Sequence, residues 1–179
     1  MTRPIPSNDH IEAFLERQVP HLWTYYCCGQ GVDVSNRMMA MPSARCRILG
    51  WQMYRHGIEG FLQWGYNFWF TQYSRHPIDP YAVTDAGDSF PSGDAFIVYP
   101  GEDGHPVPSL RQLVFHDTLQ DQRALELLEE KVPREELIAW LDEACGEPLT
   151  FRRYPRSSAW ILDIREKVNA KIKEAFAEQ

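Results

Sequence analysis

The sequence predicts an α/β fold made of parallel βα units. The first observation is the order of patterns along the 179 residues, which runs strand, helix, strand, loop, strand and helix. The second is that the three predicted strands are apolar on both faces, as in parallel sheets covered by helices. The third is a set of amphipathic helical patterns toward the end of the chain. Together these observations argue against a simple antiparallel meander.

The first part of the chain alternates short helical and strand patterns. Residues 11–18 (IEAFLERQ) place apolar side chains at helical spacing after a polar start. Residues 22–29 (LWTYYCCG) are rich in aromatic side chains and end at a glycine, which predicts a buried strand. Residues 38–57 predict a helix with Gly57 as its C-cap. A second strand is expected over residues 60–69 (GFLQWGYNFW).

A loop, a third strand and three helices follow. Residues 71–93 are rich in proline, glycine, serine and aspartate, which predicts a long loop able to fold over a pocket. Residues 94–101 (DAFIVYPG) predict the third strand. Ser109 is a suitable N-cap for the helix after it. The predicted helices cover residues 109–131, 133–145 and 157–177.

Three parallel strands are too few for a closed sheet, because exposed edges leave backbone groups unpaired. We therefore expect residues 1–132 to form the C-terminal part of a (β/α) barrel. Residues 133–179 would be a helical extension packed on it. Either a missing N-terminal barrel part or another copy of the chain, as a homo-oligomer, would cover the sheet edges. In such sheets ligands meet the C-terminal ends of the strands.

Composition excludes several classes of partner. The net charge is −7 and there is no basic run, so nucleic acid is not expected. We find neither a signal-peptide pattern nor a stretch able to cross a bilayer, so a cytoplasmic location without a membrane partner is expected. The cysteines show no zinc-ligand spacing, and no cofactor is expected. Cys27 and Cys28 are interpreted as buried reduced thiols, with a redox pair as the alternative.

Aromatic side chains are densest in residues 61–70 (FLQWGYNFWF). One interpretation is a carbohydrate site, in which rings stack on a pyranose while an amide or a phenol binds its hydroxyls. The other is packing between the sheet and its helices, the commoner fate of aromatic residues. The predicted substrate-binding residues are Tyr25, Trp64, Tyr66, Asn67 and Trp69.

Three aspartates invite a functional interpretation but have simpler structural ones. Asp94 precedes the third predicted strand, at the rim opposite to the expected site, so a turn or capping role is predicted. Asp117 and Asp121 lie four residues apart on an apolar helical stripe, and buried carboxylates need cationic partners. The candidate partners are Arg45, Arg47 and Arg111.

Three segments in order carry a resemblance to a known family: WTYYCCGQ, then ARCRILGWQMYRHGIEGFLQWGYNFW, then FPSGDAFIVYPGEDGHPVPSLRQLVFHDTLQDQRALELLEE. They resemble the C-terminal portion of the glycoside hydrolase family 123 catalytic domain, also catalogued as domain of unknown function 4091. The resemblance runs from about Trp23 to Glu130. It implies a (β/α)8 TIM-type barrel in which the predicted strands are the sixth, seventh and eighth. It also implies hydrolysis of N-acetyl-β-galactosaminides, with the substrate's own acetamide oxygen as nucleophile.

The resemblance further implies an adjacent Asp-Glu pair at an upstream strand end, where the aspartate orients the acetamide and the glutamate protonates the leaving oxygen. The adjacent Asp-Glu of this sequence is Asp142–Glu143, on a helical pattern after the matched region, and is interpreted as a solvated helix face. No residue of this chain is therefore assigned a catalytic role, and the chain alone is expected to be inactive. The alternative is a non-catalytic carbohydrate-binding module or an oligomeric assembly module.

Overall fold

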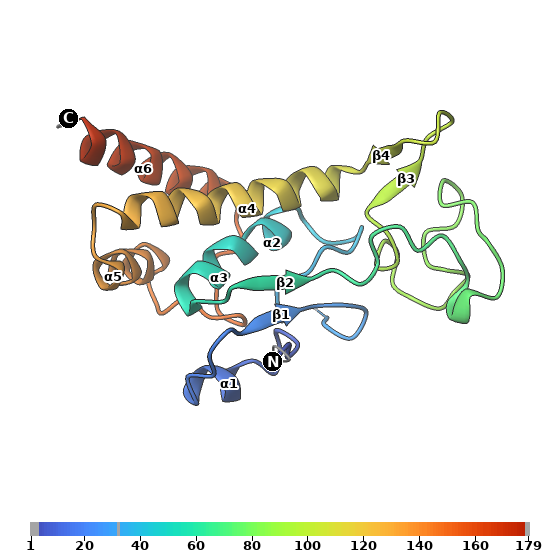
Figure 1. Ribbon diagram of the computed structural model, residues 1–179, viewed down its shortest axis with the longest axis horizontal. Helices are drawn as coiled ribbons and strands as arrows, with labels where there is room; N and C mark the ends of the chain where they lie inside the picture. Colours follow the sequence, from blue (N-terminus) through green and yellow to red (C-terminus); the bar gives the residue numbers. More distant parts are fainter. Residues whose placement is uncertain (1–3, 32, 178–179) are drawn as a thin grey trace.

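The fold is a small parallel sheet covered by helices, with an irregular lobe at one end (Figure 1). The computed structural model describes residues 4–31 and 33–177. Its elements in chain order are α1 (Glu12–Glu16), β1 (Trp23–Tyr25), α2 (Ala44–Arg47), α3 (Leu49–His56), β2 (Gly60–Leu62), the 3-10 helix η1 (Gln72–Ser74), β3 (Val98–Pro100), β4 (Pro106–Pro108), α4 (Leu110–Glu129), α5 (Arg134–Cys145) and α6 (Ser158–Phe176).

The first two predicted strands do pair in parallel. In β1 and β2, Trp23 lies opposite Gly60 and Tyr25 lies opposite Leu62. A side chain at Gly60 would not fit, because an added Cβ would lie 2.5 Å from the Trp23 indole. The glycine therefore lets the two strands approach while the indole lies across β2.

A third parallel segment comes from the N-terminus, where the sequence predicted no strand. Residues 4–8 run beside β1, with a parallel bridge between Ser7 and Tyr25. The Trp23 amide donates to the Pro4 carbonyl at 3.0 Å, and the Asn8 amide donates to the Tyr25 carbonyl at 2.9 Å. The sheet order among the described residues is thus 4–8, β1, β2.

The prediction that residues 94–101 form a third parallel strand is wrong. Only β3 is regular there, and it pairs antiparallel with β4 in a hairpin. The chain reverses directly after β3, where the Gly101 amide donates to the His105 carbonyl at 2.9 Å and Gly104 adopts a φ of +81°. The mixed α/β class is confirmed, whereas the described residues form no closed barrel.

The helices follow the sequence closely. The Ser109 hydroxyl caps α4 by accepting from the Gln112 amide at 3.3 Å, and Gly57 ends α3 with a φ of +64°. The predicted helix over residues 38–57 begins only at Ala44, because the residue before Pro42 is biased away from helical backbone angles.

Helices α2 to α6 enclose the larger hydrophobic core, in which α4 packs against α3 on one side and α6 on the other. Asp121 of α4 is fully buried in this core. Its carboxylate accepts from Arg47 at 2.7 and 2.9 Å, from the Trp51 indole at 3.1 Å and from Arg165 at 3.1 Å. The predicted pairing of Asp121 with Arg47 is confirmed, and the bond raises the pKa of Arg47.

The other predicted pairings are only partly as expected. Asp117 is exposed and lies 4.0 Å from Arg47, so the prediction that it is buried is wrong. Arg45 instead donates to the Tyr154 hydroxyl at 3.2 Å. Arg111 donates to backbone carbonyls of residues 93 and 96.

The interpretation of Asp142–Glu143 as a solvated face holds for Glu143 alone, which is exposed. Asp142 is half-buried and accepts two hydrogen bonds from Arg55 of α3, at 3.1 and 2.8 Å. It also accepts from the Leu149 amide at 2.9 Å. Asp142 therefore joins α5 to α3 and to the segment that follows α5.

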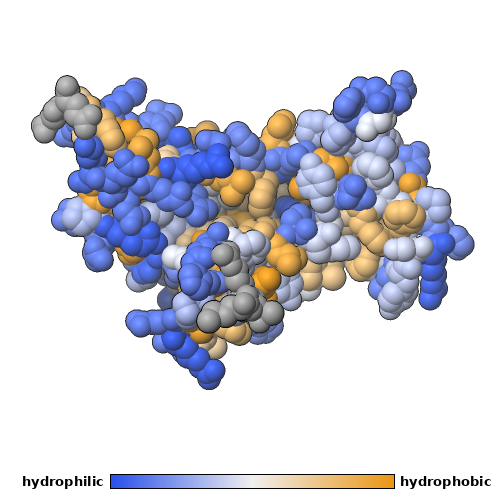
Figure 2. All heavy atoms as spheres, in the orientation of Figure 1, coloured by the Kyte–Doolittle hydropathy of each residue, from blue (hydrophilic) through white to orange (hydrophobic). Residues whose placement is uncertain are grey.

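The lobe comprises residues 63–108 and lies at the right of Figure 1, away from α5 and α6. It has its own small core, formed by Ala86, Ala95 and Phe96. The predicted loop over residues 71–93 is confirmed except for the single turn η1. In Figure 2 apolar residues gather near the middle of the visible face and over this lobe. No helix in the described part of the chain is long and apolar enough to span a membrane.

Candidate functional site

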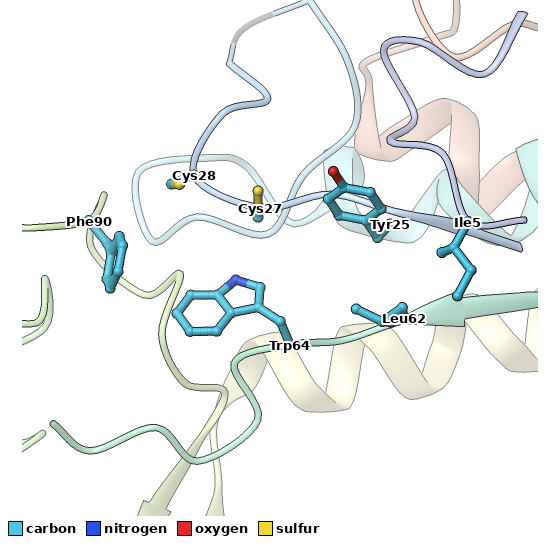
Figure 3. Close-up of a pocket in the computed structure, with 7 residues that line it drawn as sticks. All are labelled: Ile5, Tyr25, Cys27, Cys28, Leu62, Trp64 and Phe90. Atoms are coloured by element: carbon cyan, nitrogen blue, oxygen red, sulfur yellow. The ribbon is translucent and has the colours of Figure 1, made fainter. Parts of the chain in front are cut away.

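An apolar pocket of about 400 Å³ opens at the C-terminal ends of the parallel strands. Tyr25 and Leu62 are the last residues of β1 and β2 and are register partners, so their side chains meet at this edge. The position agrees with the general rule for ligand sites in parallel sheets. Figure 3 shows the lining residues, which are Ile5, Tyr25, Cys27, Cys28, Leu62, Trp64 and Phe90.

Trp64 forms the broadest wall of this pocket. Its ring packs against Phe68 at 5.7 Å between centroids and edge-on against Phe90 at 5.4 Å. The indole nevertheless remains 37% exposed. In Figure 3 the nitrogen-bearing edge of the ring faces Cys27 and Cys28. The loop residue Phe90 thus brings the loop over residues 71–93 to the pocket, as its position after the second predicted strand suggested.

The loop after β1 supplies the opposite rim. The Cys27 amide donates to the Gln30 side chain at 2.7 Å, and the Asn36 amide group donates to the carbonyls of Cys27 and Gln30 at 3.0 and 2.9 Å. Cys28 is exposed and Cys27 is half-buried, so the interpretation of both as buried thiols is wrong. Partial desolvation and the neighbouring Cys27 raise the pKa of Cys28. A thiol with a raised pKa remains protonated at neutral pH, which counts against the redox alternative.

The five predicted substrate-binding residues are divided by the structure. Tyr25 and Trp64 line the pocket, whereas the other three lie outside its lining. The Tyr66 hydroxyl accepts from Gln112 of α4 at 3.0 Å, and the Trp69 indole donates to a backbone carbonyl of β3 at 3.0 Å. Asn67 is exposed and bridges to residue 96. A sugar-binding role for all five stays a prediction.

Tyr66 turns away because β2 ends before it, so strand alternation does not continue through residues 63–69. Gly65 causes the bend. An added Cβ there would lie 2.5 Å from the Asp94 carbonyl oxygen, so the backbone of residue 65 packs directly on that of residue 94. The side chains after the bend therefore meet α4 and the lobe core instead of the pocket.

The prediction that Asp94 lies in a turn is confirmed, since its amide donates to the Pro91 carbonyl at 3.0 Å, whereas the prediction that it lies at the opposite rim is wrong. Its side chain is fully buried, 3.6 Å from Arg37, and beside the indole N–H of Trp64. Burial raises the pKa of Asp94, an effect that Arg37 and the Trp64 N–H partly offset. The strand-end argument failed because the segment around Asp94 does not join the parallel sheet.

The sequence analysis did not predict that Ile5 and Phe90 line the pocket or that Asp94 lies beside Trp64. Ile5 lies between Pro4 and Pro6, and prolines argue against a strand in the interior of a sheet. Phe90 lies in a polar loop, where an isolated aromatic residue gives no periodic signal. The buried charge of Asp94 follows from contacts distant in sequence, which no local pattern reveals.

The side chains that line the pocket are suited to binding a ligand. Aromatic and aliphatic walls suit the apolar face of a ring, and no carboxylate belongs to the lining. Among residues 4–31 and 33–177, no three histidine, cysteine, aspartate or glutamate side chains gather closely enough to hold a metal ion.

The family model described as "Glycoside hydrolase 123, catalytic domain" matches residues 2–128. These residues include β1, β2, the lobe, most of α4 and every residue that lines the pocket. No match was found among curated proteins.

Proposed function

Since the chain belongs to the glycoside hydrolase 123 catalytic domain family, we propose that its apolar pocket binds an N-acetyl-β-galactosaminide. The observation that carries the proposal is that Tyr25 and Trp64 meet in one pocket at the C-terminal ends of two parallel strands. The proposal also takes those strands as part of a (β/α)8 barrel.

The pocket suits one sugar ring in size and in chemistry. Its volume of about 400 Å³ lies in the range of small-molecule sites. The exposed Trp64 face offers a surface for the C–H groups of a pyranose, and the Tyr25 hydroxyl offers a hydrogen-bond donor and acceptor. Leu62 and Ile5 make the remaining wall apolar.

We further propose that this chain supplies binding and that the acid and the acetamide-orienting carboxylate come from a further barrel segment or a second copy. The support is that the pocket lining contains no carboxylate and that Asp142 already binds Arg55 and the Leu149 amide. Substrate-assisted hydrolysis needs a group that protonates the leaving oxygen. The same features favour the alternative, a non-catalytic carbohydrate-binding module.

The binding proposal is tested by titrating the protein with N-acetylgalactosamine and following tryptophan indole resonances by NMR. Trp64→Ala should weaken binding about tenfold or more, because truncating a central aromatic anchor costs more than about 1 kcal/mol. Tyr73→Ala is the matched control, since Tyr73 is an exposed aromatic residue of the lobe outside the pocket lining. Equal affinities of the two variants would contradict the proposal.

An activity assay separates the hydrolase from the binding module. The chain should bind an aryl N-acetyl-β-galactosaminide without releasing the aryl group. Turnover by the isolated chain would overturn the proposal that the catalytic groups come from another segment or a second copy. Turnover that appears only when an upstream segment of a family member is added would favour the hydrolase over the binding module.

A further inference from the structure

Asp94 and Arg37 form a buried ion pair that lacks the hydrogen bonds such pairs normally make. Both side chains are almost completely buried, and the Arg37 Nη1 lies 3.6 Å from the Asp94 Oδ1. Neither carboxylate oxygen has a hydrogen-bond partner, and neither do the Arg37 Nε and Nη1. Buried polar atoms without partners are rare and call for an explanation.

The backbone holds Asp94 in place independently of its carboxylate. Arg37 donates through Nη2 to the Asp94 carbonyl at 2.8 Å, while Arg111 donates to the carbonyls of Gly93 and Phe96. The Phe68 amide donates to the Ala95 carbonyl at 3.2 Å. Four successive carbonyls are thus occupied, which fixes the direction in which the Asp94 side chain extends.

That side chain is directed toward the indole N–H of Trp64, a residue of the pocket wall, although Asp94 is not itself a lining residue. The groups that face it are Arg37, Arg111, the Cys28 backbone and the Trp64 indole N–H. Arg111 is occupied with carbonyls, whereas Arg37 keeps Nε and Nη1 without partners beside the carboxylate. The indole N–H is the donor among these groups that belongs to an aromatic side chain of the pocket wall. The indole N–H and the carboxylate approach each other without completing a hydrogen bond.

We propose that Asp94 is a positioning residue of the sugar site: when a sugar stacks on Trp64, the buried Asp94 carboxylate, which otherwise lacks a partner, accepts the indole N–H and fixes the plane of the ring. This inference rests on the proposed function. Phe68 and Phe90 restrain the apolar part of the ring, and Asp94 restrains its polar edge. A stacked sugar would hold the ring against Asp94 and exclude water, which strengthens a hydrogen bond to a charged acceptor.

The first test needs no sugar. The indole resonance of Trp64 is assigned by its disappearance in Trp64→Phe, and its shift is followed from pH 7 to pH 4. We expect the resonance to move as Asp94 gains a proton, above the ordinary aspartate range because burial raises the pKa of Asp94. The movement should be lost in Asp94→Asn. A resonance that stays constant, or that moves equally in Asp94→Asn, would overturn the inference.

The second test measures the affinity for N-acetylgalactosamine. Asp94→Leu removes the acceptor and should weaken binding about tenfold, whereas Asp94→Asn keeps an acceptor oxygen and should lose about threefold or less. Thermal unfolding of both variants checks their fold, and the Asn variant remains informative if the Leu variant does not fold. Equal affinities for both variants and the unmodified protein would contradict the inference.

The two tests separate failure of the inference from failure of the proposed function. If the unmodified protein does not bind the sugar, the proposed function fails, while the pH titration still reports on the contact between Asp94 and Trp64. If the protein binds the sugar but the Trp64 resonance does not shift with the protonation of Asp94, only the positioning role fails.

Discussion

Two aspartates one turn apart on α4 show how strongly a single residue depends on its neighbours. Asp121 is fully buried and accepts hydrogen bonds from Arg47, Trp51 and Arg165, whereas Asp117 is exposed. A buried carboxylate is tolerable only when its charge and lone pairs are satisfied.

Replacing Asp121 by Asn should lower the free energy of unfolding by about 2–3 kcal/mol, because it leaves the half-buried Arg47 and Arg165 without their counter-charge. Asp117→Asn, the matched control on the same helix, should change stability by less than about 0.5 kcal/mol. Urea unfolding of both variants measures the difference. Similar midpoints for the two would show that the buried cluster is not the anchor of α4.

At the same scale, residue type and spacing predicted the Asp121–Arg47 pair, and Tyr25 and Trp64 proved to share a pocket. The burial of Asp94 was not predictable in this way. It depends on Arg37, which lies 57 positions earlier in the chain.

At the scale of elements, β1 and β2 depend on close backbone approach. Gly60 accommodates the Trp23 indole, and this contact sets the register that brings Tyr25 next to Leu62. The walls of the pocket therefore depend on a residue that does not touch it.

Gly60→Ala should destabilise the protein by about 1–3 kcal/mol, because the added methyl group overlaps the Trp23 ring. Gly31→Ala is the control, since a Cβ at Gly31 meets no atom within 4 Å. Thermal unfolding compares the two. A Gly60→Ala protein as stable as the control would show that the indole moves aside freely.

Helices were predictable from the sequence more fully than strands, of which the first two pair as predicted and the third does not, for a physical reason. The Ser109 cap, the Gly57 terminus and the 3.6-residue apolar period are local properties of the chain. Strand pairing instead requires a partner elsewhere. The apolar residues Ala95 and Phe96 are buried in the lobe core, with no need for a place in the parallel sheet.

At the scale of the whole molecule, one histidine connects pH to folding. His56 ends α3 and stacks on Phe151 with ring centroids 5.5 Å apart, and its Nε2 is buried without a partner. Burial, with the nearby Arg55, lowers the pKa of His56 to about 4. The unfolded chain, with an ordinary histidine pKa, binds the proton more tightly than the folded protein.

The contribution of His56 to stability should therefore be fully present above pH 6.5 and decline as the pH falls from 6.5 toward 4, by about 3 kcal/mol. His56→Gln should remove this part of the dependence of the unfolding free energy on pH, while the exposed control His76→Gln should keep it. Urea unfolding at several pH values provides the measurement. Identical slopes in His56→Gln and the unmodified protein would contradict the assignment.

The wall of the pocket that Ile5 forms is attached to the sheet less firmly than the other walls. Pro4 and Pro6 accept from β1 through their carbonyls, at 3.0 Å from the Trp23 amide and 3.1 Å from the Thr24 hydroxyl, but have no amide hydrogen to give back. The return bond comes from Asn8, whose amide donates to the Tyr25 carbonyl at 2.9 Å, so residues 4–6 before it should open locally at a lower free energy than β1 and β2. When they open, Ile5 leaves the pocket, so under the proposed function this segment should add a route for the dissociation of a bound sugar.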